Sequence, residues 1–144
     1  MSLLDENFIS IPLYYMVKAG KYDSKQVVVL ADDTASKMLE EGSSSVQILN
    51  TKWKVLTWKE QNDLLKESER PAEAGEMPSF DWALFQERRL KKALRWWDLK
   101  QNDADPEPLA VSSDNVDKMP SHVIRALLDK YDAVANMDEE EEKN

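Results

Sequence analysis

The sequence predicts an α+β fold in which a mostly helical body of three principal helices follows a small N-terminal β-hairpin or sheet. Two observations lead to this class. Apolar and β-branched residues dominate 13–17 and 26–30, and turn-forming residues lie between these segments, as in a β-hairpin. From residue 57 onward, apolar residues recur at helical spacing between residues that begin and end helices.

We expect three parts in the chain. Residues 1–50 form a β element with one short helix, and residues 51–136 form the helical body. Residues 137–144 are an acidic tail, because five consecutive carboxylates at 138–142 are too charged to bury. At 144 residues the chain is long enough to bury one core without metal or disulfide support.

Within the first part, a short helix is expected after the hairpin. Asp32 or Asp33 can cap its start, and Gly42 is placed to end it in the left-handed conformation. A third strand is expected at 46–49, where apolar and polar residues alternate. The segment 53–56 either extends this strand or forms a separate one.

The first principal helix begins at a capping box. The Thr57 hydroxyl can accept from the Glu60 amide, and the Glu60 carboxylate can accept from the Thr57 amide. The helix is expected to reach about Arg70, because Pro71 cannot continue it. The polar, breaker-rich segment 71–78 then predicts a loop.

The longest helix is expected from Phe80 to about Leu99, with Ser79 as its cap. Two apolar faces appear when this segment is placed on a helix at 100° per residue. The wider face holds Phe80, Ala83, Leu84, Leu90, Leu94 and Trp97, and the nearly opposite face holds Trp82, Phe85 and Trp96 beside Arg89. Two apolar faces indicate that the helix packs against the core on one side and against further core or a partner on the other.

The third principal helix is expected from Pro120 to about Ala135. Proline suits a first helical turn, and six apolar residues follow at helical spacing (Val123, Ile124, Leu127, Leu128, Tyr131 and Val134). Before it, Ser112 or Ser113 can cap a short turn.

Composition excludes several classes of function. The net charge of −9 opposes nucleic-acid binding that depends on neutralising phosphates, so no nucleic acid is expected as a partner. The absence of cysteine removes disulfides, thiolate metal sites and cysteine nucleophiles. No apolar run has the length of a membrane span and the N-terminus does not resemble a signal peptide, so no membrane association is expected.

No group of residues predicts catalysis, and we expect neither an enzyme nor a cofactor or metal site. The single histidine, His122, lacks a neighbouring nucleophile or second ligand and is expected on the surface. Asp103, Asp105 and Glu107 alternate like a calcium loop, but the glycine and glutamate that such a loop needs are missing. Neither phosphate-binding glycine pattern occurs.

Aromatic and basic side chains suggest a protein-binding surface instead. All five tryptophans lie between residues 53 and 97, and the densest basic cluster, 88–95, lies among them. This cluster could contact nucleic acid, but a solvated helix face with intrahelical ion pairs is the simpler interpretation. Tryptophan and arginine are the residue types most enriched at interface hot spots. The partner-binding candidates are Trp82, Phe85, Arg89, Trp96, Trp58 and Trp53; ordinary core packing is the alternative for the aromatic members.

A further pattern of mainly apolar positions runs through residues 50–130. It comprises the segment Trp53–Asn62, then Phe80, Asp81 and Trp82, and a series of later positions. These are Leu90, Ala93, Leu94, Trp97, Asp98, Leu99, Leu109, Ala110, Val111, Met119, Pro120 and the segment 123–128. In the order and spacing of these residues, without an invariant motif, residues 50–130 resemble the phage tail assembly chaperone family.

The resemblance implies a small, mostly helical, non-enzymatic protein of the infected host cytoplasm. Such proteins bind the tape measure protein, bring tail tube protein to it, and leave as the tail matures. An apolar face that captures a client helix agrees with this role. A structural tail or baseplate component and an acidic nucleic-acid mimic that inhibits a host protein are the alternatives. Both a monomer and a homo-oligomer fit the sequence.

Overall fold

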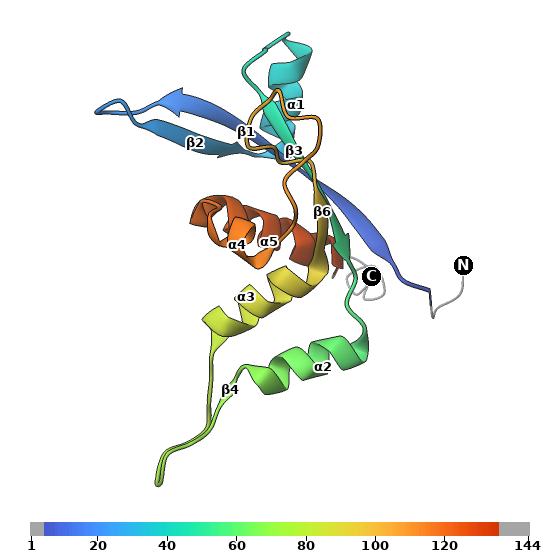
Figure 1. Ribbon diagram of the computed structural model, residues 1–144, viewed down its shortest axis with the longest axis vertical. Helices are drawn as coiled ribbons and strands as arrows, with labels where there is room; N and C mark the ends of the chain where they lie inside the picture. Colours follow the sequence, from blue (N-terminus) through green and yellow to red (C-terminus); the bar gives the residue numbers. More distant parts are fainter. Residues whose placement is uncertain (1–4, 136–144) are drawn as a thin grey trace.

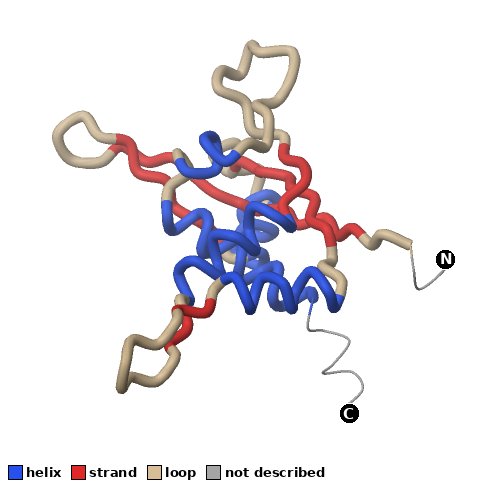
Figure 2. Tube along the Cα trace, turned by 60° about the horizontal axis from the view of Figure 1, so that its bottom comes forward, coloured by secondary structure: helices blue, strands red, loops and turns tan. Residues whose placement is uncertain are grey.

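A computed structural model describes residues 5–135 and contains a four-stranded antiparallel sheet with α3 and α5 against it (Figures 1 and 2). The strand order is β2-β1-β3-β6. These strands are β1 (Phe8–Ala19), β2 (Lys25–Leu30), β3 (Gln47–Lys54) and β6 (Leu94–Trp97). Every neighbouring pair is antiparallel.

Five helices and a short ribbon complete the described chain. The helices are α1 (Asp32–Glu40), α2 (Trp58–Glu67), α3 (Trp82–Ala93), α4 (Ser113–Asp117) and α5 (Ser121–Ala135). The ribbon consists of β4 (Glu69–Arg70) and β5 (Ser79–Phe80), and with the loop between them it projects from the body (Figure 1). The β1–β2 hairpin projects in another direction.

The predicted mostly helical body with a small N-terminal hairpin is wrong. A large sheet is central to the fold, and its first strand alone contains 12 residues. The sheet also recruits β6 from the segment 94–97, which was expected to be helical. The boundary expected at residue 50 falls inside β3, and one hydrophobic core contains residues from both sides of it.

A β-bulge in β6 explains why the helix expected at 80–99 is too long. Trp96 lies opposite Lys52 of β3, but the next residue of β3, Trp53, lies opposite Leu94. Arg95 is therefore the extra residue of the bulge. It allows Leu94 and Trp97 to be buried together although they are three positions apart.

Three positions is a helical interval, so the bulged strand continued the apolar pattern of the preceding helix. Leu90 belongs to α3 and is buried, and Leu94 and Trp97 extend its spacing without extending the helix. Periodicity alone could not distinguish the two structures. The helix ends at Ala93, and its cap is Asp81 rather than Ser79.

Polar atoms inside the core are matched by hydrogen bonds around Trp53. The Trp53 indole N–H donates to Thr51 Oγ1 at 2.7 Å, and the Thr51 hydroxyl donates to the Ile11 carbonyl at 2.7 Å. Tyr131 of α5 stacks on Trp53 with ring centroids 4.9 Å apart, and its hydroxyl donates to the Lys54 carbonyl. These contacts tie α5 to the sheet.

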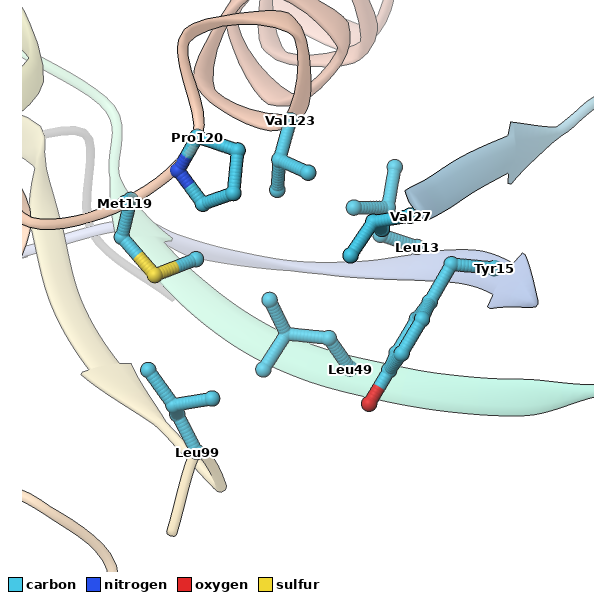
Figure 3. A pocket seen from close by; sticks show the side chains of 8 residues that line it. All are labelled: Leu13, Tyr15, Val27, Leu49, Leu99, Met119, Pro120 and Val123. Atoms are coloured by element: carbon cyan, nitrogen blue, oxygen red, sulfur yellow. The ribbon is translucent and has the colours of Figure 1, made fainter. Parts of the chain in front are cut away.

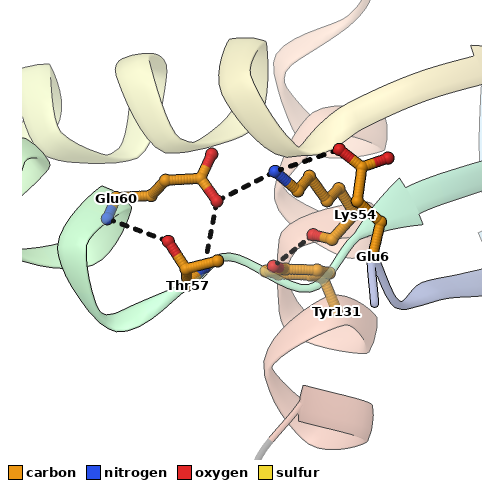
Figure 4. A network of polar contacts seen from close by, with 5 residues as sticks. All are labelled: Glu6, Lys54, Thr57, Glu60 and Tyr131. Carbon is orange, nitrogen blue, oxygen red and sulfur yellow. Dashed lines mark hydrogen bonds and ion pairs between the residues drawn. The ribbon is translucent and has the colours of Figure 1, made fainter. Parts of the chain in front are cut away.

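The capping box at the start of α2 is confirmed (Figure 4). Thr57 Oγ1 accepts from the Glu60 amide at 3.2 Å, and Glu60 Oε1 accepts from the Thr57 amide at 3.1 Å. Lys54 Nζ lies 3.0 Å from the same carboxylate and 3.8 Å from Glu6. The Thr57 backbone bond, helped by Lys54, lowers the pKa of Glu60 from 4.5 to about 2 although burial opposes this.

Other elements agree with the sequence in kind. The β1–β2 hairpin, the helix α1 and the helix α5 form where they were expected, and Gly42 adopts φ 81° after α1. The cap of α1 differs, because Ala31 occupies the N-cap position and offers no side-chain bond. Ser112 caps α4 by accepting from the Asn115 amide. The expected tail at 137–144 lies outside the described residues.

Candidate functional site

The candidate site is a cluster of three aromatic rings where α3 begins, formed by Phe80, Trp82 and Phe85 and called here the ring cluster. The centroids of Phe80 and Trp82 are 4.5 Å apart, and those of Trp82 and Phe85 are 5.9 Å apart. Both pairs are edge-to-face, a favourable arrangement for aromatic rings. Phe85 is buried, Phe80 is half-buried and Trp82 is 65% exposed. The cluster thus has a buried base and an exposed tip.

Asp81 fixes the backbone that carries these rings. Its carboxylate accepts from the Leu84 amide at 3.0 Å and from the Arg70 guanidinium at 2.6 Å. The Leu84 bond and then the Arg70 contact hold the pKa of Asp81 below its usual value. The Asp81 amide also donates to the Ser68 carbonyl at 2.8 Å. Asp81 therefore joins the end of α2, the ribbon and the start of α3.

Arg89 lies beneath the ring cluster rather than on the surface. Its side chain is 13% exposed and forms a two-pronged ion pair with Asp132 of α5, at 2.6 and 3.1 Å. The guanidinium carbon lies 5.6 Å from the Phe85 ring centroid and 5.7 Å from that of Tyr131. Its Nε atom is buried without a hydrogen-bond partner among residues 5–135. Arg89 braces α3 against α5.

Trp53 and Trp96 belong to the sheet, in β3 and β6, and not to the helix α3 that carries Trp82. Trp53 is 0% exposed in the core, so its ring is not available to a partner in this structure. Trp96 was expected beside Trp82 on a helix, but it belongs to β6, where its ring faces Lys52 at 5.2 Å. A shallow hollow of about 410 Å³ adjoins this pair and is lined in part by Ser10 and Asn50.

Trp58 is 82% exposed at the first position of α2. Among residues 5–135, no other aromatic ring stacks on it, which distinguishes it from Trp82. A lone ring offers a partner a smaller preformed surface than the ring cluster does.

The role of Phe80 differs from the one that the sequence predicts. It was placed on the core face of a helix, whereas it ends β5 and contacts both Trp82 and Phe85. The signal was present in Asp81, a strong N-cap residue directly before Trp82. A helix that begins after Asp81 leaves Phe80 outside the helical pattern.

The described residues provide no other site that suggests chemistry. His122 is exposed, and its Nε2 lies 2.7 Å from the Val27 carbonyl oxygen. Residues 5–135 contain no group of three metal-ligating side chains that could hold an ion. Asp105 accepts from the Asn102 amide in a local turn. None of the helices in this part of the chain is long and apolar enough to cross a membrane.

Fold and site together define the class of protein. It is an α+β protein with a central antiparallel sheet and an exposed ring cluster. Comparison with known proteins gives no match to a family model, a curated protein or a solved structure.

Proposed function

We propose that this protein is a non-enzymatic, chaperone-like protein of phage tail assembly that binds an apolar helix of the tape measure protein through the ring cluster. The exposed Trp82, supported by Phe80 and Phe85, is the observation that carries the proposal. Tail tube protein is the second partner, the host cytoplasm is the site of action, and no cofactor takes part. These last points come from the family resemblance.

The geometry of the ring cluster favours protein binding. The indole ring of Trp82 remains 65% exposed, although two neighbouring rings, Phe80 and Phe85, already contact it. A partner that covers the ring removes its apolar area from water. This burial contributes a favourable free energy of about 25 cal/mol per Å². Contacts with Phe80 and Phe85 restrict the indole before binding, so less side-chain entropy is lost in the complex.

The client class follows from the chemistry around the rings. The ribbon loop beside β5 adds an exposed apolar side chain, Met77, and two carboxylates, Glu73 and Glu76. An amphipathic helix can bury its apolar face on Trp82, and basic residues further along it can meet carboxylates of this loop. A long helical client presents many such segments in succession.

Coexpression with a tape measure protein tests this proposal. Trp82→Ala is expected to leave the fold intact, because the ring is largely in solvent, and to reduce the soluble client strongly. Phe8→Ala is the matched control, since it removes a half-exposed aromatic side chain at the start of β1, outside the ring cluster. Equal client recovery with Trp82→Ala and the unaltered protein would contradict the proposal.

A structural component of the tail is the second candidate, and the projecting β1–β2 hairpin favours it. A long hairpin that extends beyond the helices is suited to joining subunits in an assembly. Mass spectrometry of purified particles separates the two functions. A chaperone is absent from finished particles, whereas a structural component is present in a fixed ratio to the tube protein.

A further inference from the structure

The tip of the β1–β2 hairpin combines an exposed aromatic ring with a strained backbone. Tyr22 is 98% exposed and adopts φ 58°, and the next residue, Asp23, also has φ 58°. The left-handed conformation costs a bulky residue about 1–2 kcal/mol, and Asn or Gly would adopt it more readily. Among residues 5–135, no ring stacks on Tyr22 to offset this cost.

An apolar pocket lies at the base of the same hairpin (Figure 3). Its cavity volume is about 220 Å³, and its walls come from β1, β2, β3, the segment after β6 and the start of α5. Leu13, Leu49, Met119 and Val123 are among its lining residues, and the hydroxyl of Tyr15 is the single side-chain oxygen that lines it. An engineered apolar cavity of about 150 Å³ admits benzene, so this pocket has room for one aromatic ring.

The hairpin tip carries a net positive charge, and the segment beside the pocket carries a net negative charge. Residues 16–27 of the hairpin contain three lysines and one aspartate, and within residues 5–135 these lysines form no ion pair. The segment 98–107 beside the pocket contains four carboxylates and one lysine. Burial raises the pKa of Tyr15, and the nearby carboxylates of Asp98 and Asp103 add to the rise.

We propose that two copies of this protein form a dimer in which the hairpins lie antiparallel and each Tyr22 enters the apolar pocket of the other copy. Tyr15 and Val27 of the hairpin line the pocket, so antiparallel overlap of two identical hairpins brings each tip to the other's base. The exposed Val17 on the hairpin is covered in the same overlap. The contact is reciprocal, as a two-fold interface requires.

Sedimentation velocity across a range of protein concentrations tests the dimer. We expect the unaltered protein to dimerise, and we expect Tyr22→Asn to raise the dissociation constant at least tenfold. Asparagine suits the left-handed turn, so this variant folds at least as well as the unaltered protein. Trp82→Ala is the control and retains the dimer, because the ring cluster is a separate surface.

A charge exchange tests the pairing of tip and pocket. Lys21→Glu and Asp103→Lys are each expected to weaken the dimer, and together they are expected to restore it. A short thiol crosslinker between Lys21→Cys and Lys100→Cys tests whether the hairpin tip of one copy lies at the pocket of the other. The crosslink is specific, because the chain has no cysteine of its own. We expect crosslinked dimers from this pair and none when Met77→Cys replaces Lys100→Cys.

Three results would overturn the proposal. They are a monomer at concentrations up to about 1 mM, a dimer that Tyr22→Asn leaves unchanged, and crosslinking at Met77→Cys in place of Lys100→Cys. Each result is independent of the chaperone proposal, since client recovery with Trp82→Ala is measured separately.

Discussion

Glu60→Gln removes the charge from the capping box of α2 while keeping a side-chain oxygen that can accept a hydrogen bond. In the folded protein the pKa of Glu60 falls from 4.5 to about 2. A shift of about 2.5 units corresponds to about 3.4 kcal/mol of stability at pH 7, at 1.36 kcal/mol per unit. The Glu60 side chain is partly solvated and glutamine retains one bond, so we expect a loss of about 1–2 kcal/mol.

The pH dependence gives the sign of this effect. Because the folded pKa lies below the unfolded one, Glu60 contributes its full stabilisation above about pH 5 and loses it as pH falls through about 2. The difference between the unaltered protein and Glu60→Gln should therefore fall to less than half its pH 7 value at pH 3. Urea unfolding followed by tryptophan fluorescence measures both values.

Glu73→Gln is the matched control for this experiment. Glu73 lies in the exposed loop between β4 and β5, and we expect its substitution to change the free energy of unfolding by less than about 0.5 kcal/mol at either pH. A difference for Glu60→Gln that stays constant from pH 7 to pH 3 would refute the electrostatic reasoning.

Two further predictions concern stability, and thermal and urea unfolding measure both. Asp132→Ala leaves the nearly buried guanidinium of Arg89 without its ion pair and should lower the free energy of unfolding by about 2–3 kcal/mol. Arg89→Met leaves only a partly solvated carboxylate and should lower it by less. The reverse order would contradict the role of Arg89 in holding α3 against α5. Deletion of Arg95 removes the bulge but keeps the inward residues of β6 inward, so the fold should persist. Deletion of Leu94 instead places Arg95 opposite the buried Trp53 and should prevent folding, and equal effects of the two deletions would contradict the register.

Local signals in the sequence predicted local structure well. The capping box at Thr57 and Glu60 depends on two side chains and their own amides, so its recognition needed no knowledge of the fold. The helix α5 was recognised because six apolar residues keep one spacing over four turns. The pairing of the β1–β2 hairpin follows from a turn between two segments of apolar and β-branched residues.

Long-range pairing could not be predicted in the same way. The contact of β3 with β6 joins segments about 40 residues apart, and neither segment contains a local signal that identifies its pairing partner. The bulge at Arg95 added to the difficulty by giving a strand the apolar spacing of a helix. As a result Trp96 was grouped with Trp82 and Phe85, although it lies on the sheet.

The candidate site was predicted in part for the same reason. Trp82 and Phe85 come together because they are three residues apart on a real helix. Trp53 was a candidate because of its residue type, but a hydrogen bond to Thr51 and a stacked Tyr131 hold it in the core. Burial of a tryptophan depends on the neighbours that the whole fold supplies, which composition does not reveal.

Photocrosslinking from position 82 in a complex with the tape measure protein tests the central claim most directly. A photoreactive phenylalanine analogue replaces Trp82 in one protein and the exposed Tyr22 in another. We expect covalent adducts with apolar helical segments of the client from position 82 and none from position 22. Adducts from position 22 alone, or from neither position while the client stays soluble, would contradict binding through the ring cluster.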